Sequence, residues 1–166
     1  MLMDKAKLKV GQIGWIGKSW GAAAVLAAGS VTQDIGFILA DSPYRDIKSA
    51  VNERALRRYG NWIKIFYPIT YFLVQSRAQF DINEANIEVL ASNIRIPTLL
   101  IHSQSDDQTS SWQSVDINKK LNQKYAIFHH TQWGSRHCKD MKDHPQKYEA
   151  LIDDFLAKKA LKWPSL

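Results

Sequence analysis

The 166-residue sequence predicts an α/β fold in which a parallel β-sheet is flanked by helices. Three observations lead to this fold class. Short apolar runs alternate with stretches of helical character, which is the pattern of repeated strand–helix units. Each run is rich in Ile, Leu or Phe without polar alternation, as in strands buried on both faces. The length and the composition, 45% hydrophobic and 23% charged, suit a single folded domain over residues 1–166.

The first half of the chain predicts two strands and two helices. Gln12–Ile16 is a short apolar run, and the Ala-rich stretch Trp20–Ala28 follows it as a helix. Ile35–Ala40 is a second run of strand length. In Asp46–Arg58 the apolar residues recur at roughly helical spacing, so we expect a helix there. The whole range 46–93 is rich in aromatics and mostly helical, and we expect it to be a lid-like insertion over one end of the sheet.

The second half returns to the alternation. Thr98–His102 and Tyr125–His129 are apolar runs of strand length, and Ser111–Leu121 between them has helical character. Pro145–Leu156 is expected to be the last helix, because Pro145 suits a first helical position. Its apolar residues fall at i, i+3, i+4 and i+7, and they are Tyr148, Leu151, Ile152 and Phe155.

Composition argues against several classes of protein. A single cysteine, Cys138, excludes an internal disulfide framework and suits a reducing compartment. The N-terminal residues lack the apolar core of a signal peptide. The longest apolar run, Ile65–Val74, is too short to span a bilayer and contains Pro68. The net charge of +6 comes from scattered Lys and Arg residues without a nucleic-acid-binding motif. We therefore expect a soluble, cytoplasmic protein with no membrane span and no nucleic-acid partner.

Ser19 belongs to two overlapping motifs. Residues 17–19 (GKS) match the end of the phosphate-binding loop G-x-x-x-x-G-K-[ST]. The first glycine of that loop would fall on Gln12, and bulky residues would stand where backbone amides must approach phosphates. Residues 17–21 (GKSWG) instead match G-x-S-x-G, the sharp turn that presents a nucleophilic serine. This second interpretation leads, and a nucleotide site remains the minor alternative.

The elements around Ser19 support the serine turn, because a predicted strand precedes it and a predicted helix follows. Gly17 and Gly21 are expected to be small because side chains there would collide as strand and helix close on each other. The backbone N–H of Trp20, at the start of the helix, is expected to donate to an oxyanion. Lys18 is expected to be exposed beside Ser19, where its charge would attract an anionic substrate.

A nucleophilic serine on this fold needs a carboxylate and then a histidine downstream. Asp106, with Asp107 as the fallback, follows the predicted strand Thr98–His102, where a carboxylate can orient an imidazole. His137 lies in a loop between the last strand and the last helix. From that loop it can reach both Ser19 and Asp106 and act as the general base.

The remaining histidines are the other candidates for the base, and they are His102, His129, His130 and His144. His102 and His129 lie in or at the ends of predicted strands and are expected to be structural, while His144 is expected to cap the last helix. His137, Cys138 and His144 do not have a recognisable zinc spacing. We therefore expect no metal and no other cofactor.

These residues resemble the α/β-hydrolase superfamily. The matching segments are 13–21 (IGWIGKSWG), 40–43 (ADSP), 97–106 (PTLLIHSQSD) and His137, and the match continues into the last helix. The chain is most similar to the bacterial serine esterase and acyl-hydrolase branch, which is related to dipeptidyl-peptidase-like hydrolase domains. The resemblance implies Ser19 as nucleophile, Asp106 as orienting acid and His137 as base, with the Trp20 amide as one oxyanion donor.

The resemblance also implies a truncated fold, because the serine turn of that superfamily follows the fifth strand. The four preceding strands, and a loop that supplies the second oxyanion N–H, have no counterpart, and residues 1–10 are not expected to replace them. The Gln12–Ile16 strand would then have an open apolar edge. We expect a homo-oligomer, or a partner chain that pairs with this edge. Loss of one oxyanion donor is expected to lower turnover by about 10²–10³-fold.

The leading function is a serine hydrolase that cleaves a small carboxylic ester or related acyl substrate through an acyl-enzyme. The alternative is a catalytically impaired hydrolase fragment that acts as a binding or assembly module. The aromatic residues of the insertion suit either a hydrophobic acyl pocket or a core, and they are Trp62, Phe66, Tyr67, Tyr71 and Phe72.

Overall fold

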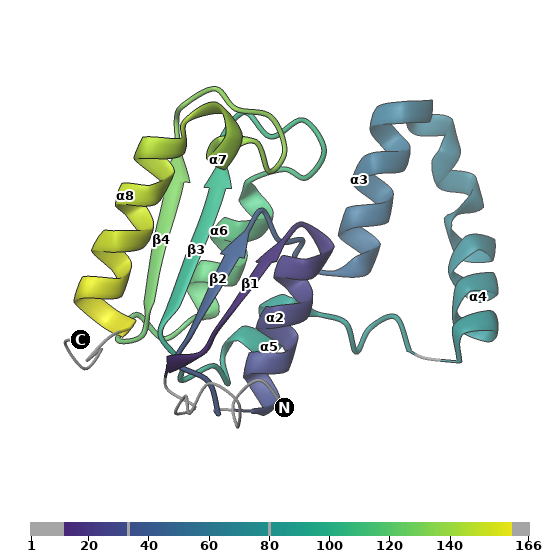
Figure 1. The fold of residues 1–166 in the computed structure, drawn as a ribbon. Coiled ribbons are helices and arrows are strands. Elements are labelled where there is room, and N and C mark those ends of the chain that lie inside the picture. The colour runs from purple at the N-terminus through teal and green to yellow at the C-terminus, as the bar shows by residue number, and fades with distance from the viewer. Residues whose placement is uncertain (1–11, 33, 80, 161–166) are drawn as a thin grey trace.

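The computed structural model describes residues 12–32, 34–79 and 81–160 (Figure 1). Within these ranges a single parallel sheet is formed with the strand order β1-β2-β3-β4, which confirms the predicted α/β class. The strands are β1 (Gly14–Lys18), β2 (Phe37–Asp41), β3 (Thr98–Ser103) and β4 (Ala126–Thr131). The expectation that residues 1–10 add no strand lies outside the described residues.

Each predicted strand overlaps an observed one, and the ends agree to within two residues. The largest differences are shifts toward the carboxyl ends. β1 begins at Gly14 and runs on to Lys18, because its ladder with β2 continues until Lys18 lies opposite Asp41. This extension carries the strand up to Ser19, so the residue after β1 is the serine of the G-x-S-x-G motif.

Helices cover both faces of the sheet. One face packs against α2 (Trp20–Val31), α5 (Ile87–Ala91) and α6 (Trp112–Lys120), and the other packs against α8 (Pro145–Phe155). Because alternate residues of a strand point to opposite faces, neighbours in β2 enter different cores. Ile38 and Ala40 pack with α2, α5 and α6, whereas Leu39 packs with Tyr148 and Phe155 of α8. The central strands β2 and β3 are therefore buried on both sides, as their apolar sequences predict, whereas β4 is only partly buried and Ile16 of β1 is exposed.

The segment between β2 and β3 divides into two parts. Its first part, here called the α3–α4 hairpin, consists of α3 (Ile47–Tyr59), the 3₁₀ helix η2 (Asn61–Phe66) and α4 (Tyr67–Ala78). Asp46 caps α3 by accepting a hydrogen bond from the Ser49 backbone N–H at 2.7 Å. The hairpin stands beside the sheet, at the right of Figure 1. The second part, α5, returns to the body of the molecule and is buried against α2 and α6.

Two short elements complete the structure around β4 and α8. The α7 helix (Asp140–Asp143) lies between β4 and α8, and the π-helical turn η3 (Leu156–Ala160) follows α8. No helix in the described ranges combines the length and the hydropathy needed to cross a membrane.

Candidate active site

The carboxyl ends of the parallel strands meet at one edge of the sheet, and the candidate site lies there. Ser19 follows β1 directly, Asp106 lies three residues beyond the end of β3, and His137 lies six residues beyond the end of β4. The strand order places β1 at one side of the sheet and β4 at the other. The loop after β4 must therefore reach back across the sheet to bring His137 to Ser19.

Ser19 has an unusual backbone conformation. Its φ is 53° and its ψ is −119°, a positive-φ state that residues other than glycine rarely adopt. The Ser19 N–H donates to the carbonyl of Asp41 at 2.8 Å, which ties the turn to the end of β2. The strained residue lies between strand and helix, so the turn is sharp. The Ser19 hydroxyl therefore projects above the sheet edge.

The two flanking glycines differ from the expectation that both avoid a collision. A Cβ at Gly17 would lie 2.2 Å from the backbone oxygen of Gly21, so a side chain there is excluded by the backbone of α2. A Cβ at Gly21 would meet nothing within 4 Å. The expectation is therefore wrong for Gly21, because that residue faces away from β1 on the exposed side of the helix.

Three predicted site residues are joined by hydrogen bonds. His137 Nε2 lies 2.8 Å from Ser19 Oγ, and His137 Nδ1 lies 2.6 Å from Asp106 Oδ2. The Asp106 side chain is fully buried, and that of His137 is 9% exposed. With the Nδ1–H donated to the carboxylate, Nε2 is left to accept a proton from the serine hydroxyl. This arrangement can activate Ser19 as a nucleophile.

Asp106 is held by more than His137. Its Oδ1 accepts hydrogen bonds from the backbone N–H groups of Gln108 and Thr109, both at 2.8 Å. Its Oδ2 also lies 3.1 Å from Nε2 of His102, a fully buried histidine in β3. Burial raises the pKa of Asp106, but the bonds from His102, His137 and the two amides outweigh it and hold the pKa well below its ordinary value. The carboxylate is therefore ionised at neutral pH.

His102 also belongs to the site, although only a structural role was predicted for it from the sequence. Its ring joins two elements, because Nδ1 lies 2.6 Å from Ser114 Oγ in α6 while Nε2 faces Asp106 and the Thr109 carbonyl. Two acceptors around Nε2 require that this nitrogen carries the proton. The sequence did carry a signal for this contact, because His102 lies at the end of a predicted strand and only four residues before Asp106.

The carboxylate also determines the titration of His137. Burial lowers the pKa of this imidazole, but the hydrogen bond to Asp106, the influence of the adjacent Cys138 and the negative charge of Asp106 more than compensate. The pKa of His137 is therefore raised above the ordinary 6.5.

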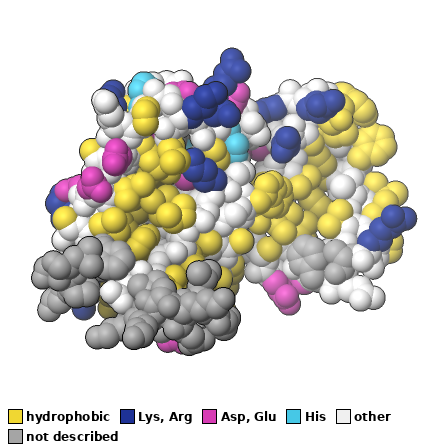
Figure 2. Space-filling view, viewed as in Figure 1, with side chains coloured by type: hydrophobic (Ala, Val, Ile, Leu, Met, Phe, Trp, Pro, Cys, Tyr) yellow, Lys and Arg dark blue, Asp and Glu magenta, His cyan; other side chains and the backbone are white. Residues whose placement is uncertain are grey.

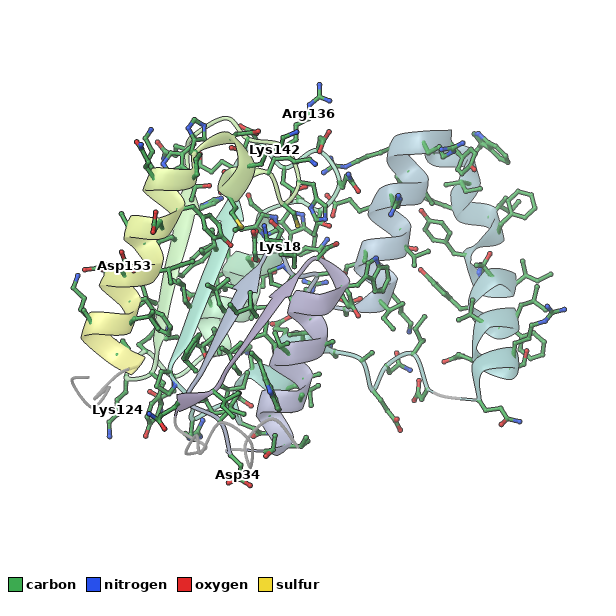
Figure 3. All side chains as sticks on the ribbon, in the orientation of Figure 1. Lys18, Asp34, Lys124, Arg136, Lys142 and Asp153 are labelled. Atoms are coloured by element: carbon green, nitrogen blue, oxygen red, sulfur yellow. The ribbon has the colours of Figure 1, made fainter. Side chains whose placement is uncertain are left out.

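Asp107 occupies a different position from Asp106. Its Oδ1 accepts from the backbone N–H of His137 at 3.2 Å, and its Oδ2 lies 3.9 Å from Nε of Arg136. Its side chain is 48% exposed. Asp107 thus contacts the backbone of His137 and not the imidazole ring, and Arg136 extends outward at the top of Figure 3.

The other histidines lie outside this hydrogen-bonded series. His129 and His130 belong to β4, where burial lowers the pKa of each ring. His144 precedes α8, but its side chain does not cap that helix, because its Nε2 bonds to the Trp133 carbonyl at 3.1 Å. Among the described residues, no cluster of three or more His, Cys, Asp or Glu side chains could hold a metal ion.

Lys18 does not extend beside the serine as expected. Its Nζ lies 3.7 Å from Oδ2 of Asp41 and over the ring of Tyr148, 5.5 Å from the centroid. Asp41 is buried, and it also accepts hydrogen bonds from the hydroxyls of Ser42 and Tyr148. Burial raises the pKa of Asp41, although Ser42, Lys18 and Tyr148 partly oppose the shift. The Lys18 charge is therefore turned toward a buried carboxyl group.

A small hollow of about 30 Å³ lies over Ser19. By the space that a water molecule needs, this volume holds about two waters or a group of similar size. Its lining residues are Ser19, Trp20, Ala50, Arg54, Gln108, Thr109 and His137. Trp20 is the first residue of α2, so its backbone N–H has no acceptor within the helix. That N–H can donate to the oxyanion that forms on a carbonyl oxygen when the Ser19 hydroxyl attacks the carbonyl carbon.

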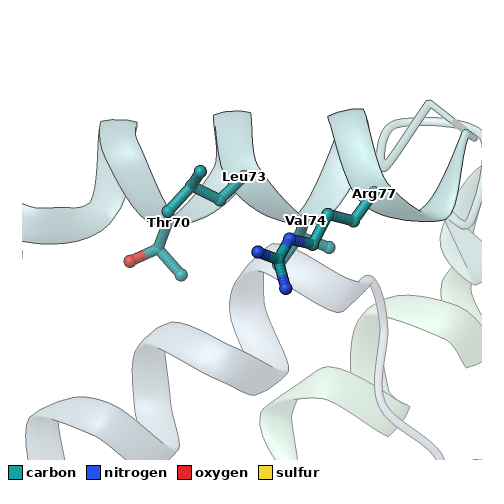
Figure 4. A pocket seen from close by; sticks show the side chains of 4 residues that line it. All are labelled: Thr70, Leu73, Val74 and Arg77. Atoms are coloured by element: carbon teal, nitrogen blue, oxygen red, sulfur yellow. The ribbon is translucent and has the colours of Figure 1, made fainter.

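The aromatic residues of the insertion neither line this hollow nor form a core. Trp62, Phe66 and Phe72 are 63%, 48% and 67% exposed, while Tyr67 and Tyr71 pack on α3 through bonds to Asn52. A separate hollow of about 670 Å³ lies on α4 (Figure 4). It is lined by Thr70, Leu73, Val74 and Arg77, and none of the residues around Ser19 reaches it.

Comparison with solved structures identifies the fold. The chain is similar to an esterase of Pyrococcus furiosus with a TM-score of 0.65 and 17% identity, over 90% of this chain and 55% of the esterase. It is similar to the acylaminoacyl peptidase of Pyrococcus horikoshii with a TM-score of 0.73 and 16% identity, over 99% of this chain and 27% of the peptidase. An α/β fold family hydrolase of Bacillus anthracis matches with a TM-score of 0.66 and 12% identity, over 93% of this chain and 70% of the hydrolase.

The described residues therefore have the fold of part of an α/β hydrolase, with the helical α3–α4 hairpin inserted between β2 and β3. The chain spans about half the length of the esterase and about a quarter of the peptidase. No family model and no curated protein matches the sequence.

Proposed function

We propose that the chain is a serine hydrolase that cleaves a carboxylic ester or a related acyl bond. The proposal is carried by the hydrogen-bonded series Ser19–His137–Asp106, in which the serine is held at positive φ at the start of a helix. The hydrolases among the structures of the same fold, two of which are named as an esterase and an acylaminoacyl peptidase, support this class of function.

The geometry supports an acyl-enzyme mechanism. His137 Nε2 accepts the Ser19 proton while Oγ attacks the carbonyl carbon, and the resulting oxyanion accepts a hydrogen bond from the Trp20 N–H. The imidazolium, stabilised by Asp106, then protonates the leaving alcohol as its bond to the carbonyl carbon breaks. A water molecule, activated by the same imidazole, releases the acid from Ser19 in the second half of the reaction.

A fluorophosphonate probe tests this proposal directly. The activated Ser19 oxygen attacks the phosphorus and displaces fluoride, which leaves a stable adduct that intact mass spectrometry detects. We expect one adduct in the 166-residue chain and none in Ser19→Ala, with His137→Ala at least about 10³-fold slower. Equal labelling of wild type and Ser19→Ala would overturn the assignment of the nucleophile.

The second candidate function is a binding or assembly module without efficient catalysis. It is favoured by the edge strand β1, where Ile16 is 64% exposed. A folded chain that never labels would support this alternative. A nucleotide site is not favoured, because the Lys18 ammonium is directed at Asp41 and the Ser19 hydroxyl at His137.

A further inference from the structure

Arg54 is the one permanently charged side chain that lines the hollow over Ser19. It comes from α3, where Ala50 lies four residues before it and lines the same hollow. Residues four apart share a helix face, so α3 presents its Ala50–Arg54 face to the serine. The small Ala50 side chain leaves the space in front of Ser19 open, while Arg54 lies about one turn farther along the helix. Arg54 is exposed, which places its guanidinium at the rim of the hollow.

The neighbouring cations have partners, whereas Arg54 has none among the described residues. Arg57 pairs with Glu53 at 2.7 Å, and Arg45 pairs with Asp116 at 3.2 Å. Glu53 adjoins Arg54 in sequence, but its carboxylate is directed at Arg57 and at the N–H groups of Ser110 and Gln113. The guanidinium at the rim is therefore free to bind an anion.

The surroundings of the hollow add to this positive potential. Lys and Arg side chains gather over α3 and over the loops at the carboxyl ends of the strands (Figure 2), and the whole chain carries a net charge of +6. The His137 imidazole is the other titratable lining group, and its contacts are Ser19 and Asp106. Asp106 itself is buried beneath His137 and fully bonded.

We propose that Arg54 binds a carboxylate of the substrate, so that the chain hydrolyses esters with a short acyl group and an anionic alcohol portion. This inference rests on the proposed hydrolase function. The small hollow limits the acyl group, and the exposed position of Arg54 assigns the carboxylate to the part of the ester that extends toward solvent. A guanidinium matches a carboxylate through two parallel N–H···O bonds, which also orients the scissile carbonyl.

Two acetate esters that share the acetyl group and the aromatic ring test the proposal. They are 4-acetoxybenzoate, which carries a carboxylate on its leaving group, and methyl 4-acetoxybenzoate, in which the carboxylate is masked. We expect Arg54→Gln to reduce kcat/KM for 4-acetoxybenzoate by about tenfold, mainly through KM, because an exposed charge-assisted contact is lost. The neutral ester should change by less than about twofold. Arg54→Lys should recover part of the loss, since it keeps the charge and loses the planar fork.

Arg57→Gln is the matched control. It removes the same charge from the same helix, but Arg57 does not line the hollow and is paired with Glu53. It should leave the preference between the two esters unchanged. If Arg57→Gln and Arg54→Gln weaken 4-acetoxybenzoate hydrolysis equally, the loss comes from the overall positive potential of the basic surface. Arg54 is then not a carboxylate site.

A binding measurement separates this inference from the proposed function. In Ser19→Ala, which cannot form an acyl-enzyme, calorimetry should show 4-acetoxybenzoate binding that weakens about tenfold when Arg54→Gln is added. Loss of hydrolysis and of probe labelling with this binding intact would overturn the hydrolase and retain the carboxylate site. Active hydrolysis with no preference for the anionic ester would overturn the carboxylate site and retain the hydrolase.

Discussion

His137 faces two carboxylates, and its contacts explain why only one of them can affect its titration strongly. The Asp106 oxygen lies 2.6 Å from the ring nitrogen Nδ1, whereas Asp107 accepts a bond from the backbone of His137. Asp106 is in turn fixed by His102, which is anchored to α6 through Ser114. The orientation of the imidazole therefore depends on a buried histidine that does not contact Ser19.

The rate of fluorophosphonate labelling should rise with pH, with a midpoint above 6.5. His137 must be neutral to accept the Ser19 proton, and its raised pKa keeps the ring protonated at lower pH. Asp106→Asn removes the charge that raises this pKa, so the midpoint should move down and the plateau rate should fall by about 10³–10⁴-fold. Labelling rates followed by mass spectrometry on both sides of pH 6.5 give both quantities.

Asp107→Asn is the matched control for this pH profile. It makes the same chemical change one residue away, and it should leave the midpoint in place because Asp107 does not touch the imidazole ring. A wild-type midpoint at or below 6.5 would contradict the direction of the His137 shift.

At the scale of elements, β1 has to hold the serine turn rigidly although it is an edge strand. Its carboxyl end holds the serine turn, which needs a rigid strand, and its ladder to β2 provides that rigidity on one side. On its other side β1 pairs with no strand among the described residues. Ile16 is 64% exposed in this edge strand, so its apolar surface is open to another chain.

We predict that this edge supports self-association of the 166-residue chain and that Ile16→Lys weakens it. A lysine on an edge strand resists pairing because its charge must be desolvated when a second strand approaches. Light scattering across a concentration series should show a larger mass for the wild type than for Ile16→Lys. Val31→Lys is the control, because it also replaces an exposed apolar residue but lies at the end of α2. A monomeric wild type at all concentrations would refute the prediction.

At the scale of the whole molecule, the sheet and the α3–α4 hairpin differ in how much they bury. The central strands of the sheet are enclosed between two cores, whereas α3 buries no residue and α4 has a largely exposed outer surface. Large apolar side chains are open on the hairpin, among them Ile65 at 78% and Phe72 at 67% (Figure 2). The proposed carboxylate site is built on α3, so the less buried part of the molecule supplies it.

Hydrogen exchange should reveal this difference in stability. Backbone amides of α3 and α4 should exchange faster than those of β2 and β3, because local opening of the hairpin exposes little additional apolar surface. Exchange followed by mass spectrometry on peptides from residues 47–78, compared with peptides from 37–41 and 98–103, measures it. Equal protection in the two regions would mean that the hairpin unfolds only together with the sheet.

Much of the fold could be predicted from local sequence, and less of the site. The strands and the last helix are encoded by runs and periods of a few residues, which is why their ends agree within two residues. The segment 46–93 was less predictable, because its aromatic residues suit a pocket or a core equally well. In the structure these aromatic residues neither line the hollow nor form a core. The packing of the hairpin depends on contacts between residues that a short stretch of sequence does not include together.

The sequence by itself determined the order of strands and helices, the G-x-S-x-G turn and the chain order of serine, aspartate and histidine. Only the tertiary structure decided which groups meet. The contact between His137 and Ser19 joins residues 118 apart, and sheet register with loop path brings them to 2.8 Å. The same packing turned Lys18 toward Asp41, brought His102 to Asp106 and left Arg54 at the rim of the hollow. Motifs depend on neighbours along the chain, but partners and charges at a site depend on neighbours in space.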